Sequence, residues 1–66
     1  MKRRALTLYR LRIYDDAGNI FRSQIYVQRP AVDRQALYWA GRGCRAVIEK
    51  SDEPVSFHVI AAVMPL

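Results

Sequence analysis

The sequence is poor in the residue types on which most small enzymes and most small secreted proteins depend. It holds one cysteine, one histidine and six acidic residues among 66 positions. One cysteine cannot form an internal disulfide, so the chain is not a disulfide-stapled scaffold. One cysteine and one histidine also cannot supply the three or four ligands of a zinc site. We therefore expect neither a bound metal ion nor a cofactor.

Long apolar runs are also lacking. No stretch approaches the roughly 18 apolar residues of a membrane-spanning helix. The segment Met1-Lys2-Arg3-Arg4 looks like the start of a signal peptide, but Arg10 and Arg12 interrupt the segment that follows. A lone cysteine without an export signal is typical of a reducing compartment, so we expect a cytoplasmic protein, in the host cytoplasm if the chain is viral.

Acidic residues are outnumbered by eleven lysines and arginines, which leaves a net charge of +5. Most of the basic residues are arginines, whose planar fork of donors suits phosphates, carboxylates and aromatic faces. Two classes of partner follow from this charge. One is nucleic acid, bound through its phosphates, and the other is an acidic or nucleic-acid-binding surface of another protein. The alternative is that the charge serves solubility alone.

Alternation of apolar and polar residues predicts four β-strands. They cover residues 5–14, 20–29, 44–50 and 55–63. The first two are separated by Asp15-Asp16-Ala17-Gly18-Asn19, a composition typical of a turn. In this hairpin we pair Tyr14 with Ile20 and Arg12 with Arg22, because both inner faces are then apolar.

Proline and a helical spacing of apolar residues predict a helix over residues 30–42. Pro30 suits its first turn, and Val32, Ala36 and Trp39 fall on one side. The chain is thus predicted to be one α+β domain over residues 1–66, in the order ββαββ. Its four-stranded, mainly antiparallel sheet carries one helix on one face. Trp39 and Phe57 are predicted to be large core residues.

The first strand contains an irregularity that we leave open. Leu6 and Leu8 fall on the same face as the arginines Arg10 and Arg12. Either a bulge near residues 8–10 changes the register, or the outer face of the sheet is apolar at one end. In the second case a homodimer through Leu6 and Leu8 is a further reading.

The sheet face away from the helix is the stronger candidate for function, because tyrosine and arginine are enriched at binding hot spots. The predicted partner-binding residues are Arg10, Arg12, Tyr14, Arg22, Gln24, Tyr26 and Arg45. Gln28 and His58 are predicted on the same face, and Glu49 is its one acidic residue, able to neutralise one arginine. A second candidate is a stripe on the helix formed by Arg34, Tyr38 and Arg42, which are spaced by four. The alternative for both surfaces is a merely solvated face.

Catalytic chemistry finds little support in the sequence. A nucleophile needs a base, and the only candidate pair is Cys44 with His58, which we place on opposite faces of the sheet. The acidic pairs Asp15 with Asp16 and Asp52 with Glu53 lie in predicted turns and do not converge on one atom. We therefore expect that the protein is not an enzyme.

The hairpin over residues 9–27 and the helix that opens with Pro30-Ala31-Val32-Asp33 make the whole chain similar to small phage-encoded inhibitors, including anti-CRISPR proteins. That resemblance implies a binding protein that docks on a host protein or nucleoprotein complex, such as a defence complex. It assigns no functional residue. Many such inhibitors are acidic DNA mimics, and this basic chain departs from them. The alternative is a stand-alone nucleic-acid-binding module, although one helix does not match the two-helix RNA recognition motif.

Overall fold

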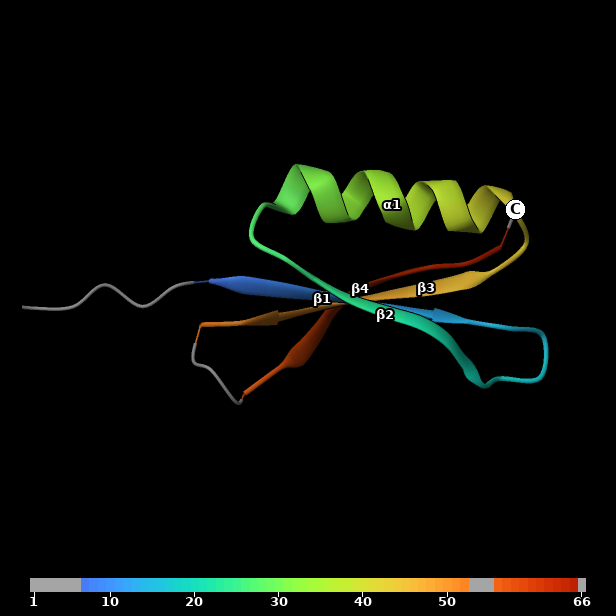
Figure 1. Ribbon diagram of the computed structural model, residues 1–66, viewed down its shortest axis with the longest axis horizontal. Coiled ribbons are helices and arrows are strands. Elements are labelled where there is room, and N and C mark those ends of the chain that lie inside the picture. Colours follow the sequence, from blue (N-terminus) through green and yellow to red (C-terminus); the bar gives the residue numbers. More distant parts are fainter. Residues whose placement is uncertain (1–6, 53–55, 66) are drawn as a thin grey trace, which may run out of the picture.

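Five secondary-structure elements follow one another in the computed structural model, which describes residues 7–52 and 56–65 (Figure 1). They are β1 (Leu8–Tyr14), β2 (Ile20–Tyr26), α1 (Arg29–Gly41), β3 (Arg45–Ser51) and β4 (His58–Val63). The strands form one antiparallel sheet in the order β2-β1-β3-β4. Helix α1 lies along one face of this sheet (Figure 1). The predicted α+β class and the ββαββ order are confirmed.

The helix and the strands lie close to their predicted bounds, although β1, β2 and β4 are shorter than predicted. Strand β2 ends at Tyr26 rather than at residue 29, because the chain turns there into the helix, which begins one residue before Pro30. The predicted start of the first strand at residues 5–6, and that of the last strand at residue 55, lie outside the described residues. Ser56 and Phe57 are described but precede β4.

The core lies between the helix and the two central strands. Its fully buried apolar residues are Leu11, Ile13, Val32, Ala36, Ala40, Ala46 and Ile48. Ala36 and Ala40 are small, so the backbone of α1 can lie close to β1 and β3. Trp39 packs at the margin of this cluster as predicted, but it remains half-buried.

Two glycines with positive φ lie where the chain changes direction, one in the β1–β2 turn and one at the end of α1. Gly18 has a φ of 85° in the β1–β2 turn, where the Asp15 carboxylate accepts hydrogen bonds from the backbone N–H groups of Ala17 and Asn19. Gly43 has a φ of 89° and ends α1. There the Gly43 N–H donates to the Ala40 carbonyl, and the next N–H donates to the Trp39 carbonyl. These two bonds form a Schellman motif, which favours glycine.

Each edge strand contains one extra residue, and these two bulges decide which side chains face the helix. In β2, Tyr14 pairs with Ile20 but Ile13 pairs with Arg22, so Phe21 is the extra residue. In β4, Ile48 pairs with Ala61 but Glu49 pairs with Val59, so Ile60 is extra. Bulges are common on edge strands, where they redirect side chains.

The predicted hairpin register is therefore wrong beyond its first pair. Arg12 lies opposite Ser23, and Arg22 lies opposite Ile13 on the helix side of the sheet. The reason is the bulge at Phe21, which shifts the rest of β2 by one residue and thus to the other face. Strand β1 itself pairs with β3 without a register shift from Leu8 to Tyr14, so of the two alternatives for this strand, the bulge near residues 8–10 is absent from that ladder.

Candidate functional site

The sheet face turned away from α1, here called the outer face, is the candidate site. The register places on it one set of side chains from each strand: Leu8, Arg10, Arg12, Tyr14, Ile20, Ser23, Ile25, Arg45, Val47, Glu49, Ser51, Val59 and Ala62. Of the predicted partner-binding residues, Arg10, Arg12, Tyr14 and Arg45 belong to this face. Among the described residues of the four strands, those with charged side chains on this face are three arginines and one glutamate, so this part of the outer face is positive.

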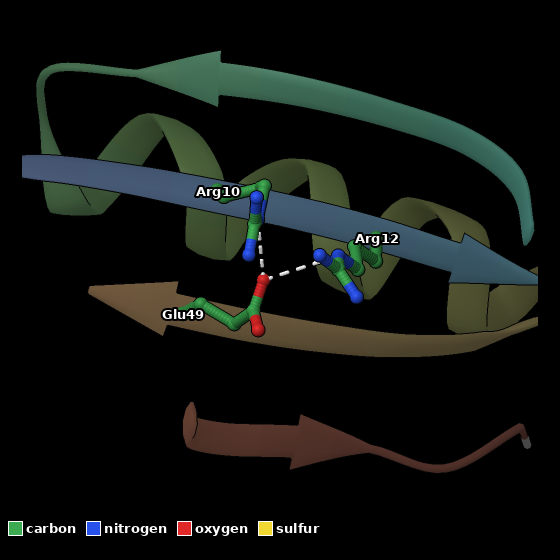
Figure 2. Close-up of polar contacts among 3 residues, drawn as sticks. All are labelled: Arg10, Arg12 and Glu49. Atoms are coloured by element: carbon green, nitrogen blue, oxygen red, sulfur yellow. Dashed lines mark hydrogen bonds and ion pairs between the residues drawn. The ribbon is translucent and has the colours of Figure 1, made fainter. Parts of the chain in front are cut away.

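A shared carboxylate holds two of these arginines together at the centre of the face (Figure 2). The Arg10 Nε donates to Glu49 Oε1 at 2.6 Å, and the Arg12 Nε lies 3.2 Å from the same oxygen. Arg10 and Glu49 are directly opposite each other on β1 and β3, whereas Arg12 reaches Glu49 along the diagonal. Glu49 therefore neutralises part of the charge of both arginines rather than of one.

The position of Glu49 is unusual for a charged residue on an uncovered sheet face. Only 8% of Glu49 is exposed, although no helix in the described part of the chain lies on the outer face. The side chains of its two arginine partners lie beside it (Figure 2). A carboxylate removed from water in this way is stable only with hydrogen-bonding partners, so Arg10 and Arg12 are held in fixed positions.

Two aromatic rings extend the arginine group along the strands. The Arg45 guanidinium lies 4.6 Å from the centre of the Tyr14 ring, which is its partner across the β1–β3 ladder. The Arg10 guanidinium lies 4.3 Å from the centre of the Phe57 ring. Phe57 is thus half-buried against the outer face and does not belong to the core, contrary to prediction. The bulge at Ile60 is the reason, because it moves the residues before it, Phe57 and Val59 among them, to the opposite face from Ala61 and Val63.

Aliphatic side chains surround this polar centre. Ile20 and Ile25 of β2 are each 52% exposed, and Val59 of β4 is 59% exposed. All three lie on the outer face through their pairing with Tyr14, Arg10 and Glu49. Sequence patterning missed them because Ile25 and Val59 alternate in phase with the core positions until the bulges are known.

Three predicted partner-binding residues lie on the helix side instead. Arg22, Gln24 and Tyr26 are paired with Ile13, Leu11 and Tyr9, whose side chains face the core. Tyr26 packs against the core, and its hydroxyl donates to Gln24 Oε1 at 2.9 Å. Their predicted place on the outer face is therefore wrong, because the bulge at Phe21 moves the rest of β2 to the opposite face.

The other residues predicted on the outer face do not all lie there either. Gln28 caps the start of α1 with its backbone, and His58 pairs with Lys50 on the helix side of the sheet. Leu8 lies half-buried on the outer face, which makes that face apolar at this end, while Leu6 lies outside the described residues.

The helix stripe retains part of its expected geometry. Arg42 lies over the ring of Tyr38 at 5.4 Å, one turn further along α1, and Arg34 is exposed one turn before it. Tyr38 also contacts Trp39 edge-to-face, and Trp39 contacts Phe21 of β2 in the same manner. Through Trp39, the end of the helix stripe at Tyr38 is thus in contact with β2. The sequence pattern did not predict this contact.

The candidate catalytic pair is separated along β3. Cys44 lies just before β3 and packs against the core, whereas His58 pairs with Lys50 near the other end of that strand. Both are on the helix side, not on opposite faces, but six residues of strand put roughly 20 Å between them. Among residues 7–52 and 56–65, no three His, Cys, Asp or Glu side chains are grouped so that they could hold a metal ion. Within the same ranges, no helix has the length and apolar character needed to cross a membrane.

Comparisons with protein families, with curated proteins and with solved structures found no match.

Proposed function

We propose that this protein is a small, non-enzymatic binding protein that docks through the outer face of its sheet. The partner is a host defence or nucleoprotein complex, and the role is that of a phage or mobile-element inhibitor, similar to anti-CRISPR proteins. The observation that carries the proposal is an uncovered sheet face with two arginines held by one carboxylate and half-exposed aliphatic residues around them.

The aliphatic residues supply a reason for association. Ile20, Ile25 and Val59 leave more than half of their surface in water in the free protein. Full burial of such a side chain contributes about 1.5–3 kcal/mol. A partner that covers the outer face removes this apolar surface from water, as a packed second layer does in most sheets.

The arginines define the chemistry of that partner. Three arginines face one glutamate, so a surface with exposed carboxylates complements the outer face. Arg10 and Arg12 are already positioned by Glu49, and Arg45 by Tyr14, so less side-chain entropy is lost on binding. A second copy of this chain would instead bring arginines against arginines, which disfavours a homodimer through this face.

Stoichiometric action fits this surface better than turnover. The outer face is a sheet surface built from cross-strand pairs, which is suited to contact another surface. The separation of Cys44 from His58 gives no dyad for nucleophilic chemistry. Inhibition by direct obstruction of a site on the partner requires only the contact.

The proposal is tested by co-purification from host lysate with and without nuclease, using two matched charge reversals. Arg45→Glu changes an exposed arginine on the outer face, and Arg34→Glu changes an exposed arginine on the helix. We expect a protein partner that survives nuclease, is retained by Arg34→Glu and is lost with Arg45→Glu. A partner lost with Arg34→Glu and retained by Arg45→Glu would place the binding surface on the helix.

A further inference from the structure

The helix side of the molecule holds a second group of aromatic and basic residues, independent of the outer face, all of them exposed except the half-buried Trp39. It consists of Phe21, Arg22, Tyr38, Trp39 and Arg42, which we call the aromatic–arginine cluster. Phe21 and Arg22 come from the bulged part of β2, Tyr38 and Trp39 from the end of α1, and Arg42 is the residue that caps the helix. The bulge is what brings Phe21 and Arg22 to the helix side together.

The three rings form a chain of edge-to-face contacts. Phe21 and Trp39 have centroids 5.5 Å apart with an interplanar angle of 67°, and Tyr38 and Trp39 have centroids 5.2 Å apart at 87°. Phe21 is 58% exposed and Tyr38 is 52% exposed. An edge-to-face contact occupies one face of only one ring in each pair, so part of the surface of Phe21 and of Tyr38 stays open to solvent.

An arginine lies over the chain of rings at each side. The Arg22 guanidinium lies 5.8 Å from the Trp39 ring centre, and the Arg42 guanidinium lies 5.4 Å from the Tyr38 ring centre. Within the described chain, neither guanidinium has an ion pair or a side-chain hydrogen bond. Arginine has five N–H donors in the guanidinium plane, and contact through its face leaves them available to an anion.

A shallow depression of about 370 Å³ lies beside the cluster. Phe21, Trp39 and Arg42 line it, together with Gly43, Cys44 and the turn residues Asp15 and Asp16. The two carboxylates repel an anion near the turn, whereas Arg42 attracts one, as does Arg22 beside Trp39. The cluster therefore favours a ligand whose flat apolar groups are attached to a negatively charged backbone.

We infer that the aromatic–arginine cluster binds single-stranded nucleic acid without sequence preference. Bases stack on exposed aromatic faces, and arginines beside them hold the phosphates. The net charge of +5 supports this assignment, because it attracts a polyanion over distance. A duplex does not offer unstacked bases, so it is not the ligand of this site.

The inference stands apart from the docking proposal, because the two surfaces lie on opposite sides of the sheet. If both hold, the outer face contacts the protein part of a nucleoprotein complex while the cluster contacts its exposed strand. Loss of either interaction leaves the other to be measured separately.

Trp39 is the only tryptophan in the sequence, and its fluorescence reports directly on the cluster. The test titrates the purified protein with an oligothymidine of about ten nucleotides, a length within the range that small single-strand sites cover. We expect quenching of Trp39 on binding. The logarithm of the affinity should fall against the logarithm of the salt concentration with a slope of about −1.4, since two phosphates are neutralised.

Substitutions then separate the cluster from the rest of the molecule. Phe21→Ala and Tyr38→Ala each remove an exposed ring and should weaken binding roughly 5- to 100-fold. Arg42→Gln should reduce the steepness of the salt dependence by about 0.7. Tyr14→Ala is the matched control, because it removes an arginine-stacked ring from the outer face and should leave the affinity unchanged.

Three results would overturn the inference. They are no binding of oligothymidine at low salt, equal binding of the native protein and the Phe21→Ala and Tyr38→Ala variants, and tighter binding of a duplex of the same length. Because Phe21 and Tyr38 are more than half exposed, their variants are expected to fold, and circular dichroism confirms it. If one variant fails to fold, the other decides the outcome.

Discussion

At the scale of single residues, Glu49 determines how the arginines of the outer face are arranged. Its Oε1 accepts from Arg10 and contacts Arg12, and the rest of the glutamate is shielded from water. The charge pair that the sequence suggested, Arg12 opposite Arg22, does not exist, since Ser23 occupies that position. No like charge therefore lies opposite Arg12 on β2, and Arg12→Glu would place a second carboxylate beside Glu49.

Glu49→Gln should lower the free energy of unfolding by about 1.5–3 kcal/mol, because a charge-assisted hydrogen bond is lost and two arginines remain close together. Urea denaturation measures the change. Asp16→Asn is the control, since Asp16 is an exposed turn residue and its variant should stay within about 0.5 kcal/mol of the native protein. Equal stability of the two variants would show that Glu49 does not hold the arginines.

Cys44 and His58 lead to a prediction about function at the same scale. Cys44→Ser and His58→Ala should both retain partner binding, since neither residue belongs to the outer face. The co-purification assay measures this directly. Loss of activity in both folded variants would indicate catalytic chemistry and would count against stoichiometric binding.

At the scale of elements, the sequence predicts the order and approximate bounds of all five, because alternation, proline and glycine each act locally. It does not predict the bulges at Phe21 and Ile60. An extra residue in an edge strand costs little free energy locally. In the bulged and in the regular register of β2 alike, some apolar side chains lie opposite apolar ones on β1. The face of every later residue in the strand follows from that one choice. The sequence pattern therefore predicts the wrong face for Arg22, Gln24 and Tyr26. It predicts the correct face for the residues on strands without an extra residue, which are Arg10, Arg12, Tyr14 and Arg45.

The end of α1 provides an element-scale test. Gly43→Ala should cost about 1–2 kcal/mol, because a side chain at a φ of 89° strains the Schellman motif. Gly41→Ala, two residues earlier and still in the helix, should be neutral or stabilise by up to about 1 kcal/mol. Thermal or urea unfolding distinguishes the two. A Gly43→Ala variant as stable as Gly41→Ala would contradict this helix end.

The two large aromatic residues predicted for the core differ in their expected contributions. Trp39 packs against the core from α1, whereas Phe57 contacts Arg10 on the outer face. Trp39→Ala should therefore destabilise by about 3 kcal/mol, at the low end for a buried tryptophan because the residue is half-buried. Phe57→Ala should cost about 1 kcal/mol, the scale of a partly exposed cation–π contact. A reversed order of the two melting temperatures would place Phe57 in the core.

At the scale of the whole molecule, the one helix of the described residues covers only one face of their four-stranded sheet. The helix side contains the core and the aromatic–arginine cluster, and the outer face contains arginines, one buried carboxylate and half-exposed aliphatic residues. A 66-residue chain has little apolar surface to spare, since a domain of this size buries only about 60% of the surface of its unfolded chain. Exposed Ile20, Ile25 and Val59 are consistent with a face that is completed by a partner.

The most direct measurement of that claim is site-specific photo-crosslinking in host cells, with a crosslinking amino acid placed at Val59, Ile25 or Leu37. Val59 and Ile25 lie on the outer face, and Leu37 is an aliphatic helix residue whose exposure, 62%, is close to the 59% of Val59. Docking through the outer face predicts that positions 59 and 25 yield the same protein adduct, unaffected by nuclease, and that position 37 yields none. An adduct from position 37 alone would contradict it.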